Sequence, residues 1–377
     1  MKTTITRAQL VEAAQAVKGL VSKDSLSPFS KIRLDASGCL SVTGSNGDVQ
    51  VEWRMDAEIK DQGTVTVPGA AFASFVGAMP EGVVEIECAG RGPRVRMEGG
   101  GVKFTLAAGE AADFPVMAGP GKDGAAPRTL RISAAVMREM LRKVKFAVST
   151  DATRKNLEGV NIDLKDGTLG MTATDGRRLA HVEKEIAPDG AGESGRCNIT
   201  LPTKTVAILY GLLERMDEGD VDVLFDGSAV RIVGDKWALT AKVLADKYPN
   251  WRQVVPEKPQ HKAELKRGAF LEAMGRAALA SDESSGVKIT LKNTSAAFEA
   301  KNDITAASAS MAACKMDEGV KGEFRVNPRL MKDALEAIDE DDFTLHFDDA
   351  GKKPIRLTCS LPWVAVVMPL QKMGKEG

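Results

Sequence analysis

The stretch Ile5-Thr6-Arg7-Ala8-Gln9-Leu10 decides the architecture, because two later stretches repeat its pattern. These are Ile132-Ser133-Ala134-Ala135-Val136-Met137 and Leu265-Lys266-Arg267-Gly268-Ala269-Phe270. Each places an extended apolar residue before a short linker and the start of an amphipathic helix. Thr6 and Ser133 are residue types that favour the N-cap position. A unit of about 130 residues therefore occurs three times, which predicts three copies of one domain.

A hairpin is predicted after the first helix of each copy. In the second copy, apolar residues alternate with others from 162 to 171 on both sides of Asp166-Gly167. Period-two alternation around an Asp-Gly or Asn-Gly pair is typical of antiparallel strands joined by a tight turn. The first copy has similar alternation before Asn46-Gly47, and the third has it before Asn302-Asp303.

A second helix is predicted in each copy from a proline near its start, since proline suits the first helical turn. The prolines are Pro68, Pro202 and Pro328. Each helix then runs into an acidic turn and a strand, at 79–83, 216–221 and 338–343. Two helices and several antiparallel strands per copy indicate an α+β fold.

Two linkers separate the copies. The ranges 118–127 and 256–259 are rich in Gly, Pro and Lys, which is typical of linkers. We therefore expect three domains of similar size at 1–122, 127–256 and 261–377.

Composition limits the class of protein. The net charge is −1, and the chain has no apolar run long enough for a membrane span and no signal peptide at Met1-Lys2-Thr3-Thr4. Its five cysteines are far apart, with no C-x-x-C pair, which favours buried free thiols in a reducing compartment. We expect a cytoplasmic protein without a cofactor, a metal or a membrane partner. Any DNA contact requires basic groups gathered on one face.

Four segments carry a resemblance to a known family. They are 112–115 (ADFP), 174–179 (TDGRRL), 248–252 (YPNWR) and 366–370 (VVMPL). In their order and spacing the whole chain resembles the bacterial replicative sliding clamp, the beta subunit of DNA polymerase III. The resemblance implies three DNA-clamp domains, each with two helices lining a ring and antiparallel sheets outside. It also implies a head-to-tail homodimer that encircles double-stranded DNA independently of sequence and acts as a processivity factor, not an enzyme.

The resemblance further implies a partner site between domains 2 and 3. There the replicative DNA polymerase, the clamp loader and other proteins with a clamp-binding motif insert a short peptide. The matching positions are Arg154, Leu157, Thr174, Gly176, Arg178, Leu179, Pro249, Val254, Val366, Met368 and Pro369. Lys155-Asn156 and Gln253 depart from the family pattern at the rim. The alternative interpretation of 366–368 is an ordinary final strand.

The ring implies two further surfaces. The basic residues expected to face DNA are Lys23, Arg138, Arg142, Lys145, Lys204, Arg215, Arg267, Arg276 and Lys332, with Arg7, Lys143 and Arg329 as additional candidates. Solvated helix faces are the alternative. The residues expected at the dimer interface are Phe104, Leu106 and Leu279, for which core burial within each domain is the alternative.

The remaining sequence patterns give little support for a catalytic or metal site. Residues 190–195 match G-x-G-x-x-G, but a strand-like segment follows where a dinucleotide site needs a helix. The acidic run 339–342 occupies the same turn as 216–221, which favours a solvated turn over a metal site. His181, His261 and His346 have no ligand spacing. A hydrolase or transferase with an interdomain site, and a scaffold that does not bind DNA, remain the competing functions.

Overall fold

The fold is described from a computed structural model, which covers residues 1–88, 94–121, 127–151, 153–186, 196–282, 285–292, 294–312, 314–316, 319–348 and 351–371. The glycine-rich range 190–195 lies outside these residues. The described residues form two compact units. The first contains 1–137 and 207–243, and the second contains 138–186, 196–206 and 244–371. The second sequence repeat thus contributes strands to both units.

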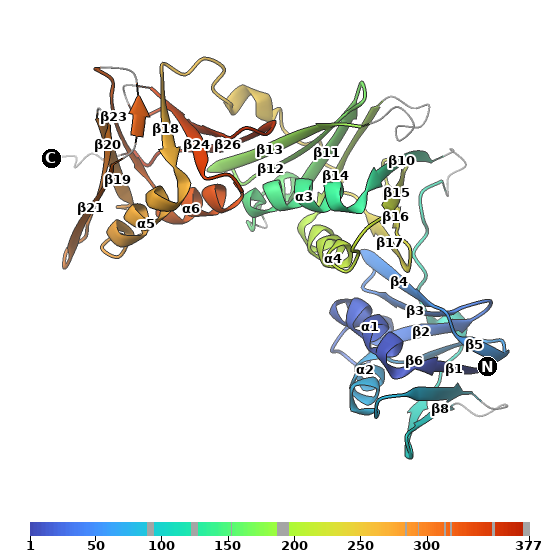
Figure 1. The fold of residues 1–377 in the computed structure, drawn as a ribbon. Coiled ribbons are helices and arrows are strands. Elements are labelled where there is room, and N and C mark those ends of the chain that lie inside the picture. The colour runs from blue at the N-terminus through green and yellow to red at the C-terminus, as the bar shows by residue number, and fades with distance from the viewer. Residues whose placement is uncertain are drawn as a thin grey trace. The chain divides into compact units, whose positions relative to one another are not determined.

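Six helices occur in the described residues, two in each repeat. They are α1 (Arg7–Val17), α2 (Gly69–Ala78), α3 (Ala134–Val144), α4 (Thr203–Leu213), α5 (Arg267–Ala278) and α6 (Pro328–Glu336). In the first unit α1 packs beside α2, and in the second α5 packs beside α6 (Figure 1). None of the described helices is long and apolar enough to cross a membrane.

The first unit holds two sheets. Five strands follow the order β5 (Glu58–Asp61), β1 (Lys2–Thr6), β7 (Val83–Glu87), β8 (Arg94–Gly99) and β9 (Val102–Ala107). Eight more follow the order β10 (Arg128–Ser133), β15 (Asp220–Phe225), β16 (Ala229–Val233), β17 (Trp237–Lys242), β4 (Val49–Met55), β3 (Leu40–Ser45), β2 (Lys31–Ala36) and β6 (Thr64–Pro68). The antiparallel pair β17–β4 joins the second repeat to the first.

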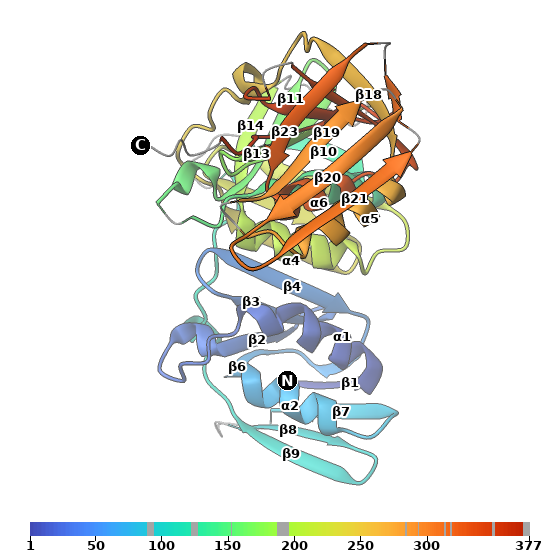
Figure 2. The same ribbon diagram turned by 90° about the vertical axis from the view of Figure 1, so that its left-hand side faces the viewer.

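The second unit also holds two sheets. Nine strands follow the order β14 (Arg196–Pro202), β11 (Gly159–Lys165), β12 (Thr168–Thr174), β13 (Arg178–Glu185), β26 (Trp363–Val367), β25 (Ile355–Thr358), β24 (Asp342–Phe347), β18 (His261–Lys266) and β22 (Cys314–Met316). Four more follow the order β21 (Ala306–Ala312), β20 (Ser295–Lys301), β19 (Val287–Lys292) and β23 (Lys321–Val326). The antiparallel pair β13–β26 joins the second repeat to the third. Strands β9 and β21 each end a sheet (Figure 2).

Local sequence signals explain several of these elements. Thr6 caps α1, because its hydroxyl accepts a hydrogen bond from the Gln9 amide. Asp166 and Gly167 have φ values of 51° and 79°, which suit the tight turn between β11 and β12. Met137, Met140, Leu141 and Val144 are all buried, as their helical spacing predicts.

Asn327 provides a test of the capping argument. Its side-chain oxygen accepts hydrogen bonds from the amides of Arg329 and Leu330 at the start of α6. Asn327→Ala should lower the free energy of unfolding by about 1 kcal/mol, because two helix-end amides lose their acceptor. Asn327→Asp keeps an acceptor and should stay close to the parent protein. Urea unfolding monitored by circular dichroism measures both, and equal losses would contradict the capping role.

Candidate partner-binding site

The expected partner site is built around one hairpin, β12–β13. Leu179 on β13 lies opposite Val366 on β26, and both side chains are almost fully buried, at 2% and 1% exposed. The Met368 amide donates to the Arg177 carbonyl over 2.8 Å, so the chain after β26 stays beside the hairpin turn. Thr174 closes that turn, because its hydroxyl donates to the Arg178 carbonyl over 2.7 Å. The structure thus brings the C-terminal segment to the TDGRRL motif.

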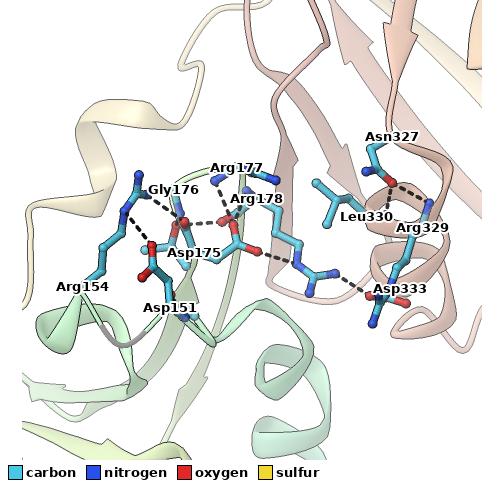
Figure 3. A network of polar contacts seen from close by, with 12 residues as sticks. Asp151, Arg154, Asp175, Gly176, Arg177, Arg178, Asn327, Arg329, Leu330 and Asp333 are labelled. Atoms are coloured by element: carbon cyan, nitrogen blue, oxygen red, sulfur yellow. Dashed lines mark hydrogen bonds and ion pairs between the residues drawn. The ribbon is translucent and has the colours of Figure 1, made fainter. Parts of the chain in front are cut away.

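Arg154 lies over the hairpin turn. Its Nη1 donates to the Asp175 carbonyl over 3.1 Å, and its Nε lies 3.7 Å from an Asp151 carboxylate oxygen (Figure 3). Gly176 in this turn has a φ of 84°, which favours glycine, and a Cβ there would lie 2.5 Å from Arg154 Nη1. Leu157 follows in the same segment and is buried. The turn and the arginine are therefore fitted to each other.

Arg178 is held on two sides rather than free to bind a ligand. Its Nε donates to Asp175 over 3.1 Å and its Nη1 to Asp333 over 2.5 Å (Figure 3). Its guanidinium also lies 5.4 Å from the centre of the Phe146 ring. With its side chain only 12% exposed, Arg178 ties β13 to α6 and fixes the edge of the site.

The segment from Tyr248 to Val254 reaches the same hairpin. Tyr248 is buried, and this burial, together with the charge of Asp175, raises the pKa of its phenol. Trp251 stacks on His181 of β13 with ring centres 3.9 Å apart. Pro249 is exposed, and Val254 and Met368 are 49% and 39% exposed, while Pro369 is buried. The exposed Met368 thus follows β26 directly, and the exposed Pro249 and Val254 belong to the segment whose Trp251 contacts His181, two residues from Leu179.

The joint between the first and second repeats serves as an internal comparison. Gln50 on β4 and Thr240 on β17 lie opposite each other there, in the register that Leu179 and Val366 occupy on β13 and β26. The Gln50 side chain accepts from the Met117 amide over 2.9 Å, and Thr240 accepts from Arg231 over 2.9 Å. Only the β13–β26 joint pairs two apolar residues at this position.

The basic residues expected to face DNA fall into two groups. Those with exposed side chains are Lys23, Lys145, Lys204, Arg276 and Lys332, and Arg138 is half-buried. Arg276 pairs with Glu272 and Lys332 lies 3.6 Å from Glu336, both within their own helices. Arg215 is also exposed, and its Nη1 donates to the Glu12 carbonyl over 3.4 Å, whereas the half-buried Arg142 and Arg267 bond to Asp339 and to the Glu340 carbonyl.

The expectation for Lys143 was wrong. Its side chain is 1% exposed, and its Nζ donates to Asp339 over 2.7 Å. Asp339 is itself exposed; partial desolvation opposes its ionisation, but the hydrogen bonds from Lys143 and Arg142 lower the pKa of its carboxyl. The buried ammonium therefore keeps a charged partner and ties α3 to the turn after α6.

Residues expected at the dimer interface differ in exposure. Leu279, just after α5, is 86% exposed, and Ile304, just before β21, is 93% exposed. Phe104 on β9 is half-buried and stacks on Phe75 with ring centres 4.3 Å apart. Leu106 is 3% exposed, so its side chain belongs to the core of its own sheet, which was the alternative interpretation. Only the backbone of Leu106 remains at the sheet edge.

Two carboxylates of the acidic run 339–342 pair with basic side chains. Asp339 bonds to Arg142 and Lys143, and Asp342 bonds to Lys266 over 2.8 Å. Within the described ranges, no three His, Cys, Asp or Glu side chains are placed to hold a metal. The role of Asp333 at the expected partner site was not found from the sequence, since it depends on a long-range contact with Arg178, whereas Asp175 lies within the TDGRRL motif.

Comparisons with known proteins follow the whole chain. Family models for the DNA polymerase III beta subunit match with its N-terminal domain at 1–118, its central domain at 131–250 and its C-terminal domain at 252–369. The chain belongs to the DNA polymerase III beta subunit family. It is 31% identical over 300 residues to the beta sliding clamp of Caulobacter vibrioides, covering 78% of each chain. It is 26% identical to the beta sliding clamp of Staphylococcus epidermidis, covering 92% of this chain and 93% of that one.

Solved structures agree with this family. The crystal structure of the DNA polymerase III beta subunit from Pseudomonas aeruginosa superposes with a TM-score of 0.90 at 25% identity, covering 98% of this chain and all of that one. The C. crescentus beta sliding clamp gives 0.89 at 28% identity, covering 98% and 99%. The α+β architecture of three repeated clamp domains, expected from the sequence, is confirmed.

Gly176 and Gly227 form a matched pair for testing the site. Both have positive φ, at 84° and 93°, but a Cβ at Gly227 would meet nothing within 4 Å. Either glycine replaced by alanine should cost roughly 1 kcal/mol of stability through backbone strain. Gly176→Ala should in addition displace Arg154 and weaken binding of a clamp-binding peptide, measured by fluorescence anisotropy. Equal peptide affinities of the two variants would contradict the fit between the turn and Arg154.

Proposed function

We propose that two copies of this chain close head to tail into a ring around duplex DNA. As a member of the beta sliding clamp family, the chain is a DNA polymerase processivity factor. The observation that carries the ring is the pair of sheet edges β9 and β21, since each edge exposes unpaired backbone groups. Leu279 and Ile304 leave apolar surface near β21, and Phe104 offers an aromatic surface on β9.

A ring resolves two opposing requirements of a processivity factor. The factor must stay on DNA, yet it must move along it without pausing. Non-specific phosphate binding has a dissociation constant of roughly 10⁻⁴–10⁻⁶ M at physiological salt, and tighter contacts would slow sliding. In a ring, release requires opening of a protein interface, while contacts with phosphates stay weak and independent of sequence.

We further propose the domain bounds, the location and the DNA-facing residues that the family implies. The domains are 1–122, 127–256 and 261–377, and the chain acts without catalysis, in the cytoplasm. The exposed basic side chains, Lys23, Lys204 and Lys332 among them, face the DNA and contact phosphates. Arg142, Arg215 and Arg267 instead bond to other groups of the protein, so they attract DNA mainly through their long-range electrostatic potential.

Retention of the protein on circular and on linear DNA tests whether it forms a closed ring. The protein should stay on nicked circular DNA during gel filtration and leave after the circle is linearised, because a ring slides off an end. Leu279→Lys should yield monomers by light scattering and lose retention, since a charge would enter the apolar joint. Leu26→Lys is the control, because Leu26 is 92% exposed in the loop after α1. Binding that survives linearisation would identify an ordinary DNA binder, and dimers of Leu279→Lys would mean that the joint is misassigned.

The partner site lies beside the β12–β13 hairpin in this proposal. Leu179 and Val366 form its apolar floor, and Val254, Pro249 and Met368 form its border. A Leu or Phe side chain of a partner peptide would cover this surface, and Met368 can adapt to several peptide sequences. The replicative polymerase and the clamp loader are the partners that the family implies. The polar pair Gln50 and Thr240 would make the other joint unsuitable.

Val254 offers a direct test of this site. Val254→Asp should weaken a clamp-binding peptide about tenfold or more, because a charge would face its apolar anchor. The dimer and its melting temperature should be unchanged, since Val254 is half-exposed. Val116→Asp is the matched control, because Val116 is 60% exposed in the first unit. Isothermal titration calorimetry measures both, and equal peptide affinity in the two variants would rule out this assignment.

A further inference from the structure

A second polar recess lies in the nine-stranded sheet of the second unit. Lys262 on β18 lies opposite His346 on β24, which lies opposite Arg356 on β25. Since opposed residues in neighbouring strands point to the same face, three basic side chains form one row across three strands. The row lines a recess of about 520 Å³, whose other residues include Thr344 and Thr358.

The hydrogen-bond donors of this row are incompletely used. Arg356 Nη1 donates to the Pro256 carbonyl over 2.8 Å, but Arg356 Nε is buried without an acceptor. In the described part of the chain, neither Lys262 nor the Thr344 hydroxyl has a side-chain hydrogen bond or ion pair. A buried donor without an acceptor costs about 1–3 kcal/mol, so an acceptor in the recess would be favourable.

The charge of the recess is poorly balanced by nearby carboxylates. Glu183 also lines the recess, and its carboxylate lies 2.8 Å from His181 and 3.8 Å from Arg252. Glu264, two residues along β18 from Lys262, lies opposite Thr344 and lines an adjoining hollow with Lys266. Burial, together with the positive charges of Arg356 and Lys262, lowers the pKa of His346 to about 4. The recess lining therefore carries two permanent cations, Lys262 and Arg356, against one carboxylate, Glu183.

We propose that this recess binds a phosphate-type oxyanion, held by Lys262, Arg356 and Thr344. Several donors approach from separate strands, which suits a tetrahedral group with oxygens in several directions better than a planar carboxylate. The positive potential disfavours a cation, and the hydroxyl and basic side chains disfavour an apolar ligand. Arg356 lies opposite Val366, so the recess borders the proposed peptide site, but phosphate binding and peptide binding are measured separately and either assignment can fail without the other.

Histidine NMR gives a direct test, because the chain has only three histidines. Inorganic phosphate, added at constant ionic strength with chloride as the balance, should raise the midpoint of the His346 titration saturably. A bound anion favours the imidazolium form, which accounts for this direction. His261 is the internal control, since it is one residue from Lys262 and points to the opposite face of β18.

Two variants and a second anion complete the experiment. Lys262→Gln should raise the half-saturating phosphate concentration about tenfold, while Lys301→Gln, at an exposed lysine of another sheet, should leave it unchanged. Lys262 is exposed, so its substitution should not disturb folding. An equal shift of the His346 titration midpoint with acetate would contradict the assignment of a phosphate-type ligand. A shift that grows linearly with phosphate and is equal in both variants would be general charge screening and would overturn the site.

Discussion

Backbone pairing between repeats is the interaction on which the rest of the structure depends. Each repeat alone would leave strand edges with unpaired amides and carbonyls, which are costly to bury and prone to association. The pairs β17–β4 and β13–β26 satisfy the edges within the chain. They continue the sheets from one repeat to the next, and β9 and β21 are two of the eight strands that end a sheet in the described residues. In the proposed ring, β9 of one copy and β21 of the other would pair and satisfy the backbone groups at these two edges.

The two joints share their backbone geometry but differ in their side chains. At β13–β26 the Trp363 indole donates to the Lys143 carbonyl over 3.0 Å, and the buried Lys143 ammonium pairs with Asp339. At β17–β4 the buried indoles of Trp53 and Trp237 lie opposite each other without a hydrogen-bond acceptor. The repeated backbone therefore sets where the repeats meet, while the side chains decide what each joint can bind. An apolar pair suits a peptide anchor, and a polar network does not.

Features that depend on residues close together in the sequence could be predicted from it, whereas features that depend on contacts between distant residues could not. The Thr6 cap, the Asp166-Gly167 turn and the apolar face of α3 were found because each depends on residues within a few positions. Lys143 was misplaced because its burial depends on Asp339, almost 200 residues away. Leu106 could not be assigned from alternation alone, since an edge strand has one face in the core and its backbone at the edge. Asp333 was missed for the same reason as Lys143, because a single long-range pair leaves no local pattern.

The distribution of positive charge follows from what a sliding ring needs. A net charge of −1 would be unsuitable for a protein that grips DNA tightly. Several arginines near the helices are bonded to backbone carbonyls or carboxylates, which restricts their motion and reduces their attraction for phosphate. Lysines with exposed side chains keep flexible, strongly hydrated ammonium groups that exchange phosphates readily. Persistence on DNA would then come from the closed protein interface and mobility from the weakness of these contacts, so the two properties could be altered independently by mutation.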